Sequence, residues 1–126
     1  MEKYLLIPPN GDISWINADR ADLCSSFRQA IGCDWVENVR TVLPNICLVV
    51  DECGKIKQEP QPHNPVASKL YYGYLVGADD IAGPAVVCAI HLVDGESDWV
   101  PLNQRELAML SLYLGLEFPE VADDRY

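Results

Sequence analysis

Continuous apolar runs mark the central strands of this chain. Ile46 to Val50 and Ala85 to Val93 are apolar at nearly every position, a pattern typical of strands buried on both faces of a sheet. Pro44-Asn45 precedes the first run and Asp94-Gly95 follows the second. These breaker residues limit both segments to the length of ordinary strands.

Two turn signals predict hairpins. Asn10-Gly11 separates the apolar run Lys3 to Ile7 from the segment Ile13 to Ile16, which can return beside it. Asp94-Gly95 separates the second central run from a strand that begins at Trp99. Because hairpin partners are antiparallel, these signals favour a mostly antiparallel sheet.

Two longer segments have the spacing of amphipathic helices. In residues 19–31 the apolar positions fall on one face, and they are Leu23, Phe27, Ala30 and Ile31. In residues 103–114, Asn103 and Glu106 form a capping pair ahead of a stripe of leucines. Gly32 and Gly115 follow these segments and are expected to end the helices.

A third, shorter helix is predicted after Asn64. Asparagine is a favoured N-cap, and Pro65 suits the first helical position. Gly73 is expected to end this helix. Its inner face is formed by Ala67, Leu70 and Tyr71.

Strand and hairpin signals thus outnumber helices, which predicts an α+β fold. We expect a mostly antiparallel sheet covered by two main helices plus one short helix. The 126 residues suffice for one domain with its own core. We assign residues 1–116 to this domain and residues 117–126 to an acidic C-terminal tail.

The chain is strongly acidic, with 9 Lys and Arg against 19 Asp and Glu and a net charge of -10. Between Val93 and Tyr126 there are eight acidic residues and two arginines. Such a field repels nucleic acid and anionic membranes, so neither is expected as a partner. It favours encounters with a basic protein surface, although acidity also serves simply to keep a small protein in solution.

The cysteines favour a reducing, cytoplasmic setting. Their number is odd and no pair has C-x-x-C spacing, so neither a disulfide framework nor a zinc site is indicated. The N-terminal apolar run is too short for a signal peptide, and no run approaches the roughly 20 apolar residues of a membrane helix. The five cysteines are Cys24, Cys33, Cys47, Cys53 and Cys88.

No catalytic or metal-binding constellation stands out. Cys88 and His91 are three residues apart in one strand, so their side chains should point to opposite faces. His63 lies in a proline-rich loop, where it can be a contact residue. Two histidines without a local pattern of further ligands do not predict a metal site. We therefore expect no catalytic residues, no metal and no cofactor.

The candidate binding residues gather around the short helix and the loop after it. Three tyrosines in four positions cannot all be core residues, and exposed tyrosines are enriched at interfaces. The alternative for the tyrosines is packing against the sheet edge, and for the adjacent aspartates a solvated turn. The candidate site comprises Asn64, Tyr71, Tyr72, Asp79 and Asp80.

The same region resembles the domain of unknown function 3846 family, whose members are short proteins of bacteria, phages and mobile elements. Asn64 to Val87 resembles its helix, loop and apolar strand, and Asp79-Asp80-Ile81-Ala82-Gly83 its Asp-Ile-x-Gly loop. Tyr4 to Gly11 and Ile46 to Lys55 match its opening strand and its acid-x-x-Gly-Lys turn. The resemblance implies a mobile-element setting but no activity. The recurrent polar residues of the family correspond here to Asn64, Tyr71, Asp80 and Gly83.

Two functions remain open at this point. The first is a non-enzymatic interaction protein that inhibits a host defence or nucleic-acid-handling protein through an acidic surface. The second is a small-molecule binder, such as a sponge for a nucleotide-derived signal, closed by a homodimer. Phosphate recognition would have to use Lys55, Lys57 and Lys69, and this scarcity of basic groups weighs against the sponge.

Overall fold

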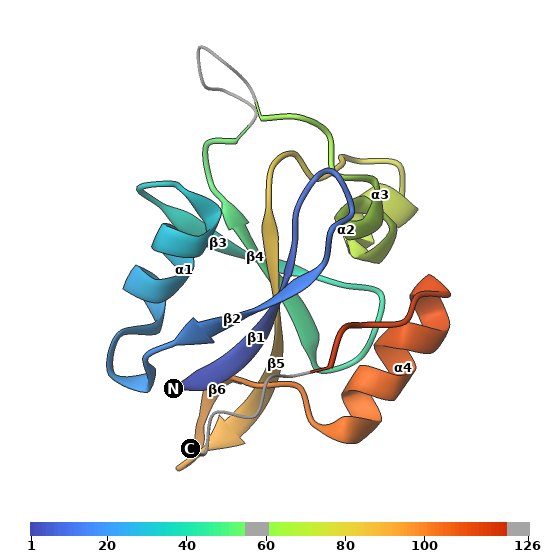
Figure 1. Cartoon of the computed structure of the whole chain (residues 1–126). Helices are drawn as coiled ribbons and strands as arrows, with labels where there is room; N and C mark the ends of the chain where they lie inside the picture. The colour runs from blue at the N-terminus through green and yellow to red at the C-terminus, as the bar shows by residue number, and fades with distance from the viewer. Residues whose placement is uncertain (55–60, 121–126) are drawn as a thin grey trace.

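The computed structural model describes residues 1–54 and 61–120. In this part of the chain an antiparallel sheet of six strands carries helices on both faces (Figure 1), which confirms the α+β prediction. The strands are β1 (Glu2–Ile7), β2 (Ser14–Ala18), β3 (Val36–Arg40), β4 (Ile46–Asp51), β5 (Ala85–Val93) and β6 (Glu96–Val100). The helices are α1 (Leu23–Ile31), α2 (Pro65–Leu70), α3 (Tyr72–Leu75) and α4 (Gln104–Leu114), with the 3-10 turn η1 (Arg20–Asp22) before α1.

Strand β5 is the centre of the sheet. The strand order is β2-β1-β5-β4-β3, and β6 pairs with the second half of β5. Its first residues, Ala85 to Val87, pair with β1 on one side and with β4 on the other. The strand is therefore fully buried from Ala85 to Ala89 and becomes exposed at Leu92 and Val93.

The helices cover opposite faces of the sheet, so the domain has three layers (Figure 1). Side chains alternate along a strand, and those of Cys47 and Val49 pack with α1 on one face. Those of Ile46, Leu48 and Val50 pack with α2 and α4 on the other face. Burial on both sides explains why β4 is apolar from Ile46 to Val50.

The helix ends follow the capping residues of the sequence. Asn103 Oδ1 accepts a hydrogen bond from the Glu106 backbone at 2.8 Å, and Glu106 Oε1 accepts one from the Asn103 backbone at 2.9 Å. This reciprocal pair confirms the expected capping box of α4. The first helix begins at Leu23 rather than at residue 19, because η1 precedes it and Asp22 provides its N-cap.

The expectation that Gly73 ends the short helix is wrong. The chain leaves α2 at Tyr71, which has an extended conformation with φ −70° and ψ 124°, and at once begins α3. Gly73 lies inside α3, where a Cβ atom would stand 2.6 Å from Cζ of Tyr71. A larger residue at this position would have to displace the Tyr71 ring, which lies against the backbone.

The first residues of the expected tail lie against the domain. Phe118 packs on the core beneath α4, and Trp15 Nε1 donates to the backbone carbonyl of Pro119 at 2.5 Å. Residues 121–126 of that tail lie outside the described residues, as do Lys55 and Lys57.

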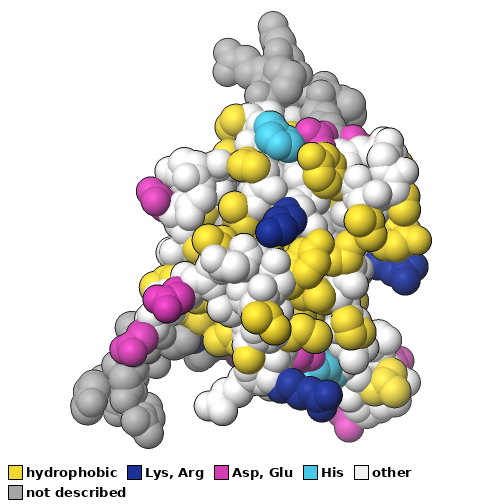
Figure 2. All heavy atoms as spheres, turned by 90° about the vertical axis from the view of Figure 1, so that its right-hand side faces the viewer, with side chains coloured by type: hydrophobic (Ala, Val, Ile, Leu, Met, Phe, Trp, Pro, Cys, Tyr) yellow, Lys and Arg dark blue, Asp and Glu magenta, His cyan; other side chains and the backbone are white. Residues whose placement is uncertain are grey.

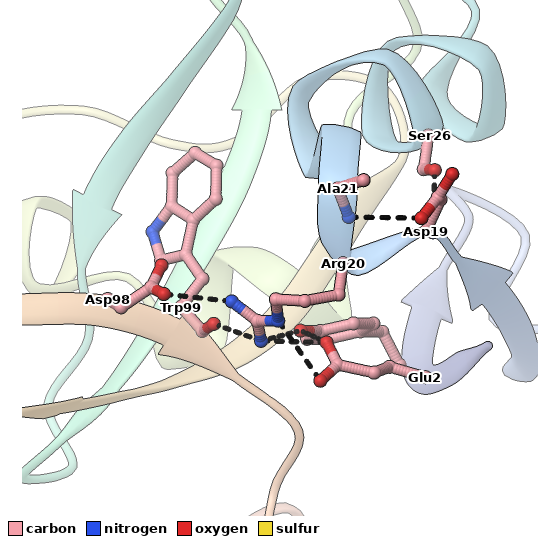
Figure 3. A network of polar contacts seen from close by, with 8 residues as sticks. Glu2, Asp19, Arg20, Ala21, Ser26, Asp98 and Trp99 are labelled. Atoms are coloured by element: carbon pink, nitrogen blue, oxygen red, sulfur yellow. Dashed lines mark hydrogen bonds and ion pairs between the residues drawn. The ribbon is translucent and has the colours of Figure 1, made fainter. Parts of the chain in front are cut away.

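A polar cluster around Arg20 joins three elements at the end of the sheet away from α3 (Figure 3). The Arg20 guanidinium donates to Glu2 of β1 at 2.7 Å and to Asp98 of β6 at 2.9 Å. It also donates to the backbone carbonyl of Trp99 at 2.7 Å. Strands β1 and β6 pair with successive parts of the same edge of β5, so Arg20 ties their ends together.

Replacing Leu48 or Val87 by Asp should unfold the domain. Both side chains are fully buried in the core cluster under α2 and α4, and an unpaired buried charge costs several kcal/mol. Thermal melting monitored by circular dichroism measures the loss. Leu92 lies on β5, the same strand as Val87, but is 76% exposed, so replacing it by Asp should leave the melting temperature nearly unchanged. A buried-site variant that melts like the wild type would contradict the assigned core.

Replacing Arg20 by Gln should reduce stability in a pH-dependent manner. Burial alone raises the pKa of Glu2, but hydrogen bonds from Arg20 and Tyr4 outweigh it and leave the pKa lowered. The Arg20 contribution is therefore present above the ordinary glutamate pKa of 4.5 and is lost as the pH falls through the lowered value.

Urea unfolding of the two proteins between neutral and acidic pH measures this difference. We expect about 1 kcal/mol or less at pH 7, because the pair is partly exposed, and a smaller difference in acid. Arg28→Gln on α1 is the control, because within the described residues the guanidinium of this arginine donates to the Ser25 hydroxyl, at 3.3 Å, rather than to a carboxylate. A loss of stability in Arg20→Gln that stays constant with pH would contradict the assignment.

Candidate functional site

A pocket of about 240 Å³ opens where β3, β4 and the loop before β5 meet. We call it the acidic pocket, because five of its lining side chains are carboxylates. They come from three separate segments of the chain and are Glu37, Asp51, Glu52, Asp79 and Asp80. The remaining wall is formed by Val39, Val50, Gly54, Tyr71, Ile81 and Ala82.

Tyr71 provides the aromatic wall of the acidic pocket. Its side chain is half-buried against the core under α2, and its backbone forms a bridge with Thr41 after β3. The close fit over Gly73 holds the ring from the other side. The pocket therefore has one fixed aromatic face among its acidic groups.

Asn64 lies beneath the site and not on its surface. Its side chain is fully buried, and Nδ2 donates to the backbone carbonyls of Ile7 at 2.8 Å and Gly83 at 2.9 Å. Its Oδ1 accepts a hydrogen bond from the Ala67 backbone at 3.1 Å and so caps α2. Gly83 has φ +83°, as expected for the tight turn before β5. Asn64 thus positions the site but cannot touch a partner.

Tyr72 is not among the residues that line the acidic pocket. It is 38% exposed on α3, and the guanidinium carbon of Arg40 lies 4.5 Å from the centroid of its ring. This is cation–π geometry. Of the five candidate residues, the structure thus brings Tyr71, Asp79 and Asp80 together in the pocket. Tyr72 stands beside them on α3, and Asn64 lies below.

Sequence reasoning missed Glu37, Asp51 and Glu52 as members of this site. The antiparallel pairing of β3 with β4 places Glu37 opposite Val50, next to the end of β4. The turn Asp51-Glu52 after an apolar run was visible in the sequence, but its approach to Asp79 depends on tertiary folding. Only a correct pairing of β3 with β4 would have added Glu37.

The carboxylates of the pocket repel one another. The pKa of Glu37 is raised by burial first, and then by the negative charges of Glu52 and Asp79. His63 lies at the rim, with Nδ1 2.7 Å from Oδ2 of Asp80, and both side chains are partly exposed. Because Glu37, Glu52 and Asp79 raise the local negative charge, the arrangement favours a cationic group.

The described residues offer little for other chemistry. No group of three or more His, Cys, Asp or Glu side chains in residues 1–54 and 61–120 is placed to hold a metal ion. Cys88 is buried beneath α1, and burial raises the pKa of its thiol well above the usual value. His91 lies on the opposite face, with Nε2 2.6 Å from Oε2 of Glu106 on α4.

No helix in the described part of the chain is both long enough and apolar enough to cross a membrane.

The molecule is thus a small three-layer α+β domain with an acidic pocket at one end of its sheet. The family model described as Domain of unknown function (DUF3846) matches residues 1–113, and the chain belongs to this family. The match confirms the resemblance carried by Asn64 to Val87. No curated protein and no solved structure matches the chain. The family description assigns no activity, so function has to be argued from the site.

Replacing Glu52 by Gln should lower the pKa of Glu37. The substitution removes one of the two negative charges that raise it, while the burial of Glu37 stays the same. Titration of the side-chain carboxyl signal by NMR measures the change. Glu96→Gln on β6 is the control and should leave the Glu37 titration in place. If the pKa of Glu37 is the same in the Glu52→Gln variant as in the wild type, the two carboxylates do not share one pocket.

Proposed function

We propose that this protein is a non-enzymatic interaction protein that binds a basic surface of a partner protein through its acidic pocket. The observation that carries the proposal is the convergence of five carboxylates from β3, β4 and the loop before β5. The net charge of -10 extends the same field over a wider surface. Such a field speeds the approach of a basic partner and disfavours acidic ones.

The pocket suits the end of a lysine or arginine side chain. Its volume of about 240 Å³ is below that of a typical site for a drug-sized ligand. A bound cation would offset the negative charges of Glu52 and Asp79, which add to the effect of burial in raising the pKa of Glu37. Tyr71 supplies an aromatic wall on which a guanidinium or the stem of a lysine can pack.

In this proposal the protein is encoded by a phage or mobile element and acts in the cytoplasm of the host. The family resemblance suggests the mobile element, and five cysteines without a disulfide suit a reducing compartment. A host defence or nucleic-acid-handling protein is the target that we propose, because proteins that bind nucleic acid carry basic grooves. The protein would then inhibit its target by occupying such a groove.

A sponge for a nucleotide-derived signal is less well supported. A phosphate in the acidic pocket would face Glu37, Glu52 and Asp79 at short range, which is repulsive. The alternative small-molecule ligand that the pocket favours is therefore a cation rather than a nucleotide.

Reversing two charges in the pocket tests the proposal. The double variant Asp79→Lys with Asp80→Lys should weaken the binding of an oligolysine peptide about tenfold or more at low salt, because it removes attraction and adds repulsion. Isothermal titration at two salt concentrations measures this, and added salt should weaken wild-type binding. Asp12→Lys with Glu96→Lys changes the net charge equally at exposed sites on other elements. If both double variants lose affinity to the same extent, the peptide senses only the net charge and the pocket is not the site.

A further inference from the structure

Four neighbouring residues of α3 and its C-terminus expose apolar surface. We call them the α3 patch; they are Tyr72, Tyr74, Leu75 and Val76, with exposed fractions of 38%, 52%, 65% and 58%. Scattered apolar residues are common on protein surfaces, but contiguous patches usually mark contact sites. Figure 2 shows hydrophobic side chains gathered over the face formed by α2, α3 and α4.

Leu75 and Val76 add little to the buried core. They are 65% and 58% exposed, and neither is among the buried residues of the two core clusters. The backbone holds α3 in place, since the N–H of Leu75 donates to the Tyr71 carbonyl at 3.3 Å and that of Val76 to the Tyr72 carbonyl at 3.2 Å.

The α3 patch is continuous with the acidic pocket. Tyr74 lines a second hollow of about 290 Å³ together with Gly77, Ala78, Asp79 and Asp80. The two aspartates belong to both hollows. One surface therefore carries bulky apolar groups on one side and carboxylates on the other, with Asp79 and Asp80 at the boundary.

We propose that the α3 patch and the acidic pocket form one docking surface for an amphipathic basic segment of a partner protein. Lysine or arginine side chains of that segment enter the acidic pocket, and its apolar side chains cover Leu75 and Val76. The inference rests on the proposed function and specifies the chemistry of the partner. Apolar contact supplies affinity, and charge complementarity supplies the direction of approach.

A second copy of this chain fits the surface less well. A two-fold symmetric contact would place the same patch of both copies against each other. It would bring two acidic pockets together between chains that each carry a net charge of -10. An anionic membrane is disfavoured for the same reason, because the carboxylates adjoin the apolar groups. Charge complementarity therefore selects a basic partner.

Two synthetic peptides test the proposal with the whole protein. One is a helix-forming amphipathic peptide of lysine and leucine, and the other carries serine in place of every leucine. The Lys/Leu peptide should bind about tenfold tighter than the Lys/Ser peptide. The double variant Leu75→Ser with Val76→Ser should abolish this advantage and leave the affinity for the Lys/Ser peptide unchanged. Fluorescence anisotropy at fixed salt measures both.

Leu92→Ser is the matched control, because Leu92 is 76% exposed at the far end of β5. It should keep the full advantage of the Lys/Leu peptide. Tyr74→Ser, a second variant within the patch, should remove part of it. All three variants exchange exposed side chains, so unchanged melting temperatures verify that they are folded.

The outcomes separate the two proposals. If the Lys/Ser peptide depends on Asp79 and Asp80 but leucine adds nothing, the docking surface is overturned and the acidic pocket stands. If neither peptide responds to Asp79→Lys with Asp80→Lys, the proposed function itself fails. If Leu75→Ser with Val76→Ser instead converts a dimer to a monomer in sedimentation, without an effect on peptide binding, the patch is a self-association surface and the inference is wrong.

Discussion

The buried amide of Asn64 is the interaction on which the site depends. It joins the end of β1, the turn at Gly83 and the first turn of α2 through three hydrogen bonds in a place without solvent. Removing it would leave two carbonyl oxygens and an N–H group buried without partners, each a considerable cost. Since α2 leads into Tyr71 and the Gly83 turn follows Asp79 and Asp80, Asn64 joins the backbone segments that hold two sides of the acidic pocket. A residue that never reaches the surface thus determines the shape of that surface.

The buried centre of the sheet forms a rigid base for the carboxylates of the acidic pocket. Residues Ala85 to Ala89 of β5 are buried between neighbouring strands and between two helical layers, so the end of the sheet cannot easily relax. The pKa of Glu37 at this end is raised first by burial and then by the negative charges of Glu52 and Asp79. At the opposite end, Arg20 compensates Glu2 and Asp98, and the pKa of Glu2 is lowered. Five carboxylates from separate segments thus converge at the end of the sheet where the acidic pocket opens, and this convergence supports a binding role for that end.

The features that could be predicted from the sequence are those that depend on residues close together in the chain. Apolar runs defined β4 and β5, and the caps at Asn64 and Asn103 lie where the pattern placed them, because both involve residues close together in the chain. Gly73 was misassigned because its need for glycine comes from the Tyr71 ring and not from a positive φ, which a pattern of helix ends cannot reveal. The site was found only in part for a similar reason. Asp79 and Asp80 are adjacent in sequence, whereas Glu37 joins them through the pairing of β3 with β4 and the docking of α3 beside β3.

The contact between Tyr71 and Gly73 links the two halves of the proposed docking surface. The Tyr71 ring lines the acidic pocket and at the same time lies against the backbone of α3, the helix that carries the apolar patch. A partner that contacts Leu75 and Val76 therefore binds the same short helix against which the Tyr71 ring packs. Groups that share a structural element in this way do not contribute independently to binding. The apolar and the charged contacts should therefore be coupled, since both act on the short segment that contains Tyr71 and α3.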